Sequence, residues 1–367
     1  MNGIEYPFWL WVTFFVVVLV ALIVDIGIVN RKAHVPSRKE TFFWSIVWIS
    51  LALSFNIFIY FALSSIFDSN IAAFKAKEFF TGYLIELSLS IDNLFVFLLI
   101  FSYFKVPRKF QHRVLFWGIM GALVMRMTMI FAGAELVERF HWIIYVFGVF
   151  LIYTGLKMFS DDEDAFNPVD SKLVSFVIKY IPIKKEYVGG QFLTRENGKR
   201  VGTMLLLVLI VVELSDVIFA VDSIPAIFGI TTDRFIVYTS NIFAILGLRT
   251  FFFLLADMAD RFHYLKYGLA FVLTFIGVKM FFPLIAHGLL LAIGENSPTA
   301  FAAFLINFEN GVYKQEVINV SLGVVAGTIA LSIILSMIFP RKSMIFPRKV
   351  EISKEKIFKT LDQENED

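Results

Sequence analysis

Long apolar stretches, separated by short polar connections, run along nearly the whole chain. Nine of them reach or approach the roughly 20 residues that a helix needs to cross the hydrocarbon core of a bilayer. They cover residues 8–29, 42–67, 80–104, 114–133, 142–159, 203–230, 236–256, 267–285 and 317–339. The pattern predicts an all-α, polytopic membrane protein with about nine transmembrane helices and the lipid bilayer as its surroundings.

Basic residues in the connections predict the orientation of the chain. With the N-terminus outside, 24 of the 33 Lys and Arg residues fall in inside segments and only 5 in outside segments. Short cytoplasmic connections carry such an excess of basic residues. The first apolar stretch has no basic segment before it and is too long for a secretion signal, so we interpret it as a retained span. We therefore expect an inner-membrane protein with its N-terminus outside and its C-terminus inside.

Composition narrows the class further. Apolar types make up 58% of the 367 residues and charged types 17%, with a mean hydropathy of +0.75. A soluble domain has roughly 25% charged residues, so an ordinary soluble enzyme and a disordered chain are excluded. The net charge of +2 is too small to indicate nucleic acid as a partner. The sequence has no cysteine, which excludes disulfides, thiolate metal sites and cysteine nucleophiles within it.

The chain contains an internal repeat. Residues 138–159 and 260–281 align without a gap, with shared Arg-Phe-His and Lys-Met-Phe motifs and with Gly155 opposite Gly277. Each copy contains three spans, so the second copy enters the membrane from the opposite side, an arrangement typical of secondary transporters. The predicted organisation is two N-terminal spans (1–79), a first three-helix repeat (80–159), a cytoplasmic loop (160–202), a second, inverted three-helix repeat (203–285), a periplasmic connection with the last span (286–339) and a cytoplasmic tail (340–367).

Acidic residues lie inside two equivalent spans, the third and the sixth. A charged side chain at the centre of a membrane helix costs about 2.5–3.5 kcal/mol on insertion scales, so a function is the better explanation for so many. The alignment places Glu86 opposite Asp216 and Asp92 opposite Asp222. The third span contains Glu86, Ser90, Asp92 and Asn93, and the sixth contains Glu213, Asp216, Asp222 and Ser223.

Helix geometry limits how these acids can meet. Glu213 and Asp216 share a helix face, whereas Asp216 and Asp222 point about 120° apart on an ideal helix. Pro225 frees a backbone carbonyl and provides a candidate hinge that would bring the acids together. Carboxylates, the Asn93 and Asn241 amides and Ser hydroxyls form an oxygen-only set, which suits Mg²⁺, Ca²⁺ or Mn²⁺.

Two intramembrane arginines leave a structural alternative open. Arg126 and Arg249, which the alignment places opposite each other, could neutralise some of the acids as buried ion pairs. A buried carboxylate that lacks a cation can instead take up a proton. Exchange of a proton for a metal ion is therefore the coupling that we expect.

The motifs resemble the TerC family of integral membrane proteins, and its Alx-like branch in particular. The resemblance rests on the segment from Glu213 to Pro225, on Gly82-Tyr-Leu-Ile-Glu86 followed by Asp92-Asn93, and on the segment from Asn241 to Arg249. It implies a bacterial inner-membrane protein associated with Mn²⁺ export and, by name, with tellurium resistance. It also implies that the connection 286–315 is longer than in that branch.

The resulting hypothesis is a non-enzymatic exporter of divalent cations that works by alternating access. Mn²⁺ is the expected ion, Ca²⁺ or Mg²⁺ are less favoured, a proton is the expected counter-ion, and no permanently bound cofactor is expected. The expected metal ligands are Glu86, Asp92, Asn93, Glu213, Asp216 and Asp222, supported by Ser90, Ser223, Asn241, Arg126 and Arg249. One alternative is a membrane scaffold that delivers metal to secreted proteins or to the insertion machinery; a weaker one is an intramembrane aspartyl protease that uses Asp92 and Asp222.

Overall fold

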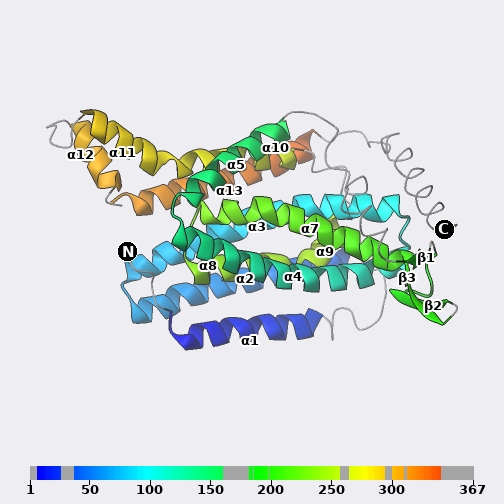
Figure 1. Ribbon diagram of the computed structural model, residues 1–367. Helices are drawn as coiled ribbons and strands as arrows, with labels where there is room; N and C mark the ends of the chain where they lie inside the picture. Colours follow the sequence, from blue (N-terminus) through cyan, green and yellow to red (C-terminus); the bar gives the residue numbers. More distant parts are fainter. Residues whose placement is uncertain are drawn as a thin grey trace.

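The computed structural model describes residues 6–25, 37–159, 182–184, 186–196, 198–256, 264–293, 300–309 and 312–339. It is almost entirely helical (Figure 1). The elements are α1 (Phe8–Val24), α2 (Arg38–Ile66), α3 (Ser69–Tyr103), α4 (Arg108–Arg139), α5 (Ile143–Phe159), β1 (Ile183–Lys184), β2 (Leu193–Glu196), β3 (Lys199–Thr203), α7 (Met204–Phe228), α8 (Arg234–Leu246), α9 (Leu248–Ala256), α10 (Leu265–Met280), α11 (Phe282–Ile293), α12 (Ala300–Glu309) and α13 (Lys314–Ile338).

Each of the nine expected spans coincides with a helix, but not every helix has the length of a full crossing. Among the residues that the structure describes, six stretches are long and apolar enough to cross a membrane, and α8 with α9 forms a seventh as a pair bent by 44°. The helices α1 and α5 are apolar but only 17 residues long. The polytopic all-α architecture is therefore confirmed with six or seven spans, while nine crossings and the inverted relation of the repeats stay predictions.

Local sequence explains where several helices begin. At α2, Ser37 and Glu40 form a capping box: the Glu40 backbone N–H donates to the Ser37 hydroxyl, and the Ser37 backbone N–H donates to the Glu40 carboxylate. At α8, the backbone N–H groups of Phe235 and Ile236 donate to Oδ1 of Asp233. Such caps satisfy N–H groups that a helix start otherwise leaves without a partner.

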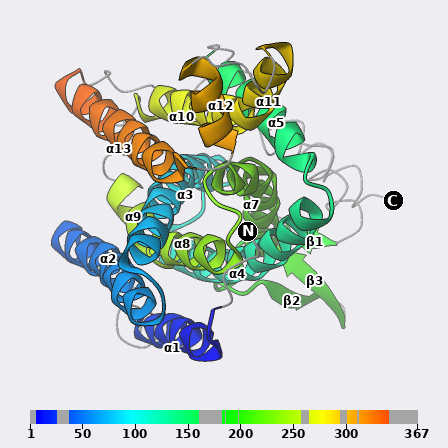
Figure 2. The same cartoon turned by 90° about the vertical axis from the view of Figure 1, so that its left-hand side faces the viewer.

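The helices form three groups when viewed along the bundle (Figure 2). The helices α3, α4, α7 and α8 lie in the middle, with α1 and α2 on one side and α5, α10 and α13 on the other. The elements that carry the predicted acids, α3 and α7, pack against each other in the middle group. Glu86 and Asp216 are thus enclosed by protein rather than facing lipid.

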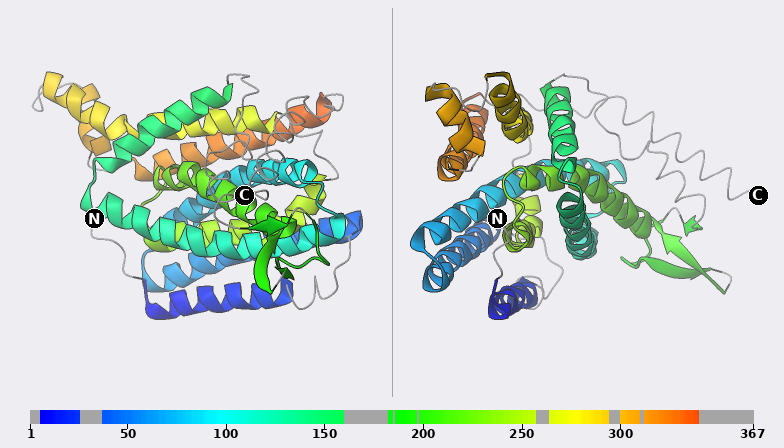
Figure 3. Two further views of the ribbon diagram at one scale, coloured as in Figure 1. Left: turned by 45° about the vertical axis from the view of Figure 1, so that its right-hand side comes forward. Right: turned by 60° about the vertical axis from the view of Figure 1, so that its left-hand side comes forward.

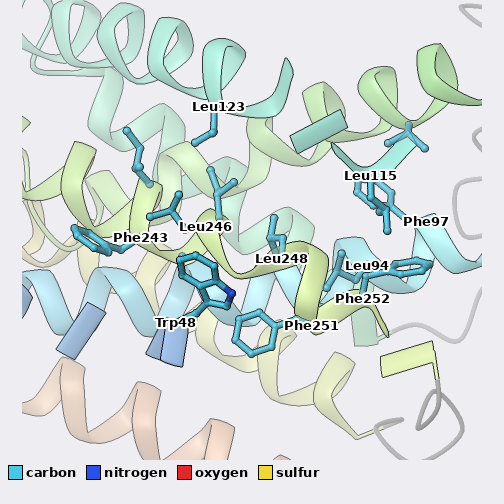
Figure 4. Close-up of a cluster of buried hydrophobic side chains, with 14 of the residues drawn as sticks. Trp48, Leu94, Phe97, Leu115, Leu123, Phe243, Leu246, Leu248, Phe251 and Phe252 are labelled. Carbon is cyan, nitrogen blue, oxygen red and sulfur yellow. The ribbon is translucent and has the colours of Figure 1, made fainter. Parts of the chain in front are cut away.

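A cluster of large apolar side chains lies beside this middle group (Figure 4). Trp48 of α2 contacts the segment around the α8–α9 break, where its indole N–H donates to the Thr250 hydroxyl at 3.3 Å. Phe252 of α9 makes an edge contact with Phe101 of α3, with 5.3 Å between ring centroids. These contacts fix α9 against α2 and α3, although α9 itself has only nine residues.

The helices α5 and α10 pack closely, with glycines of each helix against the backbone of the other. A Cβ atom at Gly155 would lie 2.7 Å from the carbonyl oxygen of Ala270, and one at Gly277 would lie 2.7 Å from the carbonyl oxygen of Gly148. Real Cβ atoms essentially never come so close to backbone oxygen, so both positions require glycine. In the sequence alignment of the repeats, Gly155 corresponds to Gly277 and Gly148 to Ala270, so one contact is made twice.

The second half of the connection 160–202 is folded. The sequence favours a solvated connector there, but from residue 182 the chain forms a three-stranded sheet in the order β1-β3-β2, with β1 parallel and β2 antiparallel to β3. The sheet projects from one end of the bundle (Figure 3).

Two aromatic residues connect the sheet to the helices. The Tyr187 hydroxyl donates to the carbonyl oxygen of Phe104 at 2.7 Å, and Arg113 lies over the Phe192 ring. The aromatic residues Tyr187 and Phe192 hold the sheet against the helices. The hydropathy pattern does not predict such contacts, which is why it indicates only a solvated connector. Residues 160–181 lie outside the described part of the chain.

The described parts of the connection 286–315 are helical. The helices α11 and α12 pack against each other as a hairpin at the end of the bundle opposite the sheet (Figure 1). Its two helices pack through four small or apolar side chains, Ala286, Leu290, Ala302 and Leu305. The eighth apolar stretch therefore continues past residue 285, because α11 remains helical to Ile293. The tail 340–367 lies outside the described residues.

Candidate functional site

Two acids from equivalent positions of the repeats meet at one arginine in the middle of the bundle. Glu86 on α3 forms an ion pair with Nη1 of Arg126 on α4. Nη2 of the same guanidinium donates to Oδ1 of Asp216 on α7 at 3.3 Å. All three residues are at least 95% buried. The ion pairing considered for Arg126 is thus present, and it joins two acids, Glu86 and Asp216, that the repeat alignment places opposite each other.

The carboxylates keep acceptor atoms that are not used. Ser90 donates its hydroxyl to Oε1 of Glu86 at 3.3 Å. Within the described part of the chain, Oε2 of Glu86 and Oδ2 of Asp216 have no hydrogen-bond donor. A buried acceptor without a donor costs about 1–3 kcal/mol, and more when it is charged. The pair therefore forms a buried anionic site with capacity for a further cation or proton.

The sixth-span acids diverge as a regular helix requires. The carboxylate of Glu213 lies against Gly121 of α4, on the same side of α7 as Asp216. Asp222 instead accepts a hydrogen bond from Thr154 of α5 at 3.4 Å. Sharing of one face by Glu213 and Asp216 is therefore confirmed. The divergence of Asp222 from Asp216 is confirmed as well, because the two contact different helices.

The expected hinge does not interrupt its helix. α7 is continuous through Pro225, which is buried, and the helix break of the second repeat occurs at Gly247, between α8 and α9. Pro225 lies three residues before the last residue of α7 and removes only one hydrogen bond, near the end of the helix. A hinge role for Pro225 stays a prediction.

The remaining expected ligands are placed as follows. Asn93 is buried on α3. Asn241 is buried on α8 and donates its amide to the Val237 carbonyl at 3.0 Å, while its Oδ1 and the Ser223 hydroxyl have no hydrogen-bond partner in the described residues. The side chain of Asp92 lies outside the described part of the structure. Unsatisfied Asn and Ser oxygens support a polar interior but show no link to the two acids at Arg126.

The described side chains do not form a complete metal site. Among them, no three His, Asp or Glu residues lie close enough together to hold a metal ion. The guanidinium of Arg126 lies between the two acids that come closest to forming one. The arrangement is a buried ion-pair cluster of two carboxylates and one guanidinium.

Arg249 has a different partner from its counterpart in the first repeat. Its Nη2 contacts Oδ2 of Asp25 at 2.5 Å and donates to the backbone carbonyl of Asp25 at 3.0 Å. This pair joins the end of α1 to α9 and does not involve the acids of the third and sixth spans. The expectation that Arg249 balances those acids is therefore wrong, since the Gly247 break directs α9 toward α1.

A second buried charge network lies where α3 and α8 begin. Lys75 forms ion pairs with Glu78 and Asp233, each with 2.8 Å between nitrogen and oxygen. The Tyr6 hydroxyl donates to Oδ2 of Asp233 at 2.6 Å. Sequence analysis missed this network because it assigned the residues before 80 to a connection, whereas α3 begins at Ser69. The spacing of Lys75 and Glu78 on an extended helix would have indicated the first ion pair.

Two further residues of the site had no sequence signal. Gly121 matters because it lacks a side chain where Glu213 needs space, and Thr154 matters because it faces Asp222. Neither position belongs to a polar cluster in its own helix. Only the packing of α4 and α5 against α7 reveals them.

Comparison with known proteins identifies the family. The model of the integral membrane protein TerC family matches residues 71–344. This chain belongs to the TerC family. The match spans α3 to α13 and so contains every helix that contributes to the site at Arg126. The family resemblance found in the sequence is confirmed.

Relatives of this TerC-family chain cover most of its length. It is 50% identical over 281 residues to the Escherichia coli K12 protein named "Putative membrane-bound redox modulator Alx", covering 76% of this chain and 87% of that protein. It is 50% identical over 271 residues to an uncharacterized membrane protein of Myxococcus xanthus, covering 74% and 82%. An uncharacterized membrane protein of Rickettsia bellii is 42% identical over 271 residues, with 74% and 87% covered. No solved structure matches. The chain is thus a multi-pass integral membrane protein.

Proposed function

We propose that this TerC-family protein transports a divalent cation across the bacterial inner membrane, with Mn²⁺ exported and protons moving in exchange. The observation that carries the proposal is the buried convergence of Glu86 and Asp216, each with an oxygen that no described donor satisfies. Two carboxylates match the charge of a divalent ion, and oxygen ligands suit Mn²⁺ better than Cu⁺ or a structural Zn²⁺. Alternating access between the two three-helix repeats would expose this site to each side in turn.

In this proposal, the sequence determines the orientation of the protein in the membrane and the direction of transport. The excess of basic residues in one set of connections favours an inside location for the end that carries the small sheet. Export then means release at the end where the α11–α12 hairpin lies. A carboxylate that releases its metal ion can bind a proton for the return step, which gives the coupling a chemical basis.

A redox function based on thiol exchange is not available to this sequence. The Alx proteins carry a name that refers to redox modulation, but the present 367 residues contain no cysteine for thiol exchange. We therefore favour an indirect route, in which transport of a redox-active metal ion alters the redox state of a compartment.

Transport into proteoliposomes tests the proposal. The full-length protein is reconstituted and uptake of Mn²⁺, Mg²⁺, Ca²⁺ and Zn²⁺ is measured at two pH values. We expect uptake of Mn²⁺ that increases with an opposing proton gradient and that Glu86→Gln and Asp216→Asn abolish. Glu135→Gln removes an exposed acid at the end of α4 and is the matched control. Absence of transport for every metal, or undiminished Mn²⁺ transport in both acid variants, would contradict the proposal.

A scaffold that hands metal to secreted proteins or to the insertion machinery is the second candidate. The folded sheet of residues 183–203 favours it, because an anchored sheet outside the helices provides a surface for a protein partner. The discriminating measurement is co-purification in mild detergent. A partner that is lost when Tyr187→Phe loosens the sheet would support the scaffold, whereas transport by the purified protein alone would make it unnecessary.

A further inference from the structure

We propose that Arg126 is a tethered counter-cation of the transport site, which neutralises Glu86 and Asp216 in the empty carrier and is displaced by the transported ion. The inference rests on the proposed function and assigns a role to a residue that is neither a metal ligand nor a surface charge. Arg126 contacts both acids at once and is 1% exposed. Its guanidinium therefore occupies the position between the carboxylates that a shared metal ion requires.

Binding of Arg126 and binding of a metal ion exclude each other. A divalent ion bound by both carboxylates needs oxygens at about 2.0–2.6 Å from its centre. Arg126 already uses Oε1 of Glu86 and Oδ1 of Asp216. The other two oxygens, Oε2 and Oδ2, are buried and have no donor in the described residues. An entering cation can engage these two oxygens first, and full coordination then requires that the guanidinium leave.

The interface between α4 and α7 provides a place for the displaced guanidinium. Glu213 lies one turn before Asp216 on the same face of α7, and its carboxylate packs against Gly121 of α4. Gly121 and Arg126 are five residues apart on the same helix, so Glu213 is an acid of the same α4–α7 interface that faces Arg126 with Asp216. Glu213 would then accept the guanidinium while the metal ion occupies the two acids.

The ion pair with Arg126 reduces the free-energy cost of the buried carboxylates during the transport cycle. Two uncompensated carboxylates in the membrane oppose the reorientation of an empty carrier, because each buried charge is costly. A guanidinium between them removes part of that cost for the return step. In the loaded carrier the divalent ion performs this task. The competition also weakens metal binding, since only the fraction of protein with Arg126 displaced is competent to bind.

Equilibrium binding of Mn²⁺ to the full-length protein in lipid nanodiscs provides the first test. Arg126→Gln removes the competing charge, and we expect Mn²⁺ to bind about 5- to 150-fold more tightly than to the wild type, the usual range for coupled sites. Arg139→Gln, an exposed arginine on the same helix, is the matched control and should leave the affinity unchanged. Unchanged or weaker binding in Arg126→Gln would overturn the inference.

Two kinds of flux separate a counter-cation from a purely structural residue. Exchange of Mn²⁺ for Mn²⁺ uses only the loaded carrier, whereas net efflux also needs the return of the empty carrier. We expect Arg126→Gln to retain exchange and to lose net efflux. Equal loss of both fluxes would assign Arg126 a structural role and overturn the inference.

Two further variants keep the test decisive if Arg126→Gln folds poorly. Arg126→Lys keeps the positive charge, and it should retain net efflux with an affinity near that of the wild type. In Arg126→Ala, added guanidinium should restore the weaker Mn²⁺ affinity, whereas the wild type should not respond. No response in Arg126→Ala, or loss of efflux and exchange together in Arg126→Lys, would overturn the inference. Wild-type protein that neither binds nor exchanges Mn²⁺ would instead contradict the proposed function.

Discussion

The carboxylate of Glu213 occupies the space that a side chain at position 121 would fill. A Cβ added at Gly121 would overlap this carboxylate, which is the far end of a flexible side chain and can shift. We therefore expect Gly121→Ala to displace the Glu213 carboxylate at a cost of about 1 kcal/mol, the low end for overpacking of a filled interior. Thermal unfolding in detergent, with Mn²⁺ transport measured in parallel, should show both losses.

A control for this substitution exists on α13. Gly323 has no atom within 4 Å of the position of an added Cβ. Gly323→Ala should therefore leave stability unchanged or raise it by about 0.5–1 kcal/mol, because alanine is the better helix former. Similar destabilisation by both substitutions would show that the contact with Glu213 is not the cause.

The Lys75 network predicts a large loss of stability when its cation is removed. Lys75→Met leaves the buried acids Glu78 and Asp233 without their shared partner. Removal of one member of a buried ion pair costs about 3–5 kcal/mol. Lys77→Met is the control: it removes only an exposed hydrogen bond to Asn319, for which we expect about 0.5–1.5 kcal/mol. Equal unfolding temperatures of the two variants would contradict the assignment.

The two repeat-related arginines should couple to different acids. We expect a double-mutant cycle of Arg249→Gln with Asp25→Asn to give a coupling free energy of about 0.5–3 kcal/mol, because these residues are in contact. The cycle of Arg249→Gln with Glu86→Gln should be additive within about 0.5 kcal/mol. Denaturant titration of each variant provides the free energies. Strong coupling in the second cycle would show that Arg249 reaches the acid site.

Docking of the small sheet should depend on pH only in alkaline solution. Burial raises the pKa of the Tyr187 phenol above its usual value, so the neutral hydroxyl that donates to Phe104 is favoured in the folded state. The stability from this group is complete below a pH of about 10, the ordinary pKa of tyrosine, and is lost as pH rises through the raised value. Limited proteolysis of residues 183–203 should accelerate above that pH. Tyr187→Phe should show no such acceleration, and an equal response would contradict the role of the hydroxyl.

Features that depend on a single helix could be predicted from the sequence. The positions of the apolar helices, the acids inside them and the shared face of Glu213 and Asp216 all follow from hydropathy and helical periodicity. The repeat alignment placed Glu86 opposite Asp216, but their meeting at Arg126 is visible only in the packing of α3, α4 and α7.

Features that depend on two helices could not be predicted in this way. Arg126 and Arg249 have equivalent places in the sequence, yet one binds the acids and the other binds Asp25, because α4 is straight while the second repeat breaks at Gly247. The importance of Gly121 depends on a side chain 92 positions away. The hydropathy pattern predicts neither the three-stranded sheet nor the α11–α12 hairpin. It does not report the aromatic contacts that hold the sheet, and it does not show that the chain stays helical past residue 285.

The doubled glycine contact between α5 and α10 has a mechanical consequence. Because Gly155 and Gly277 each hold the partner helix at its backbone, the third helices of the two repeats cannot slide or roll past each other without steric overlap. Any change that opens the site to one side of the membrane must therefore leave this pair intact and take place around it. In the proposed transport cycle, the two helices would act as the fixed pair about which α3, α4 and α7, the helices of Glu86, Arg126 and Asp216, change their tilt.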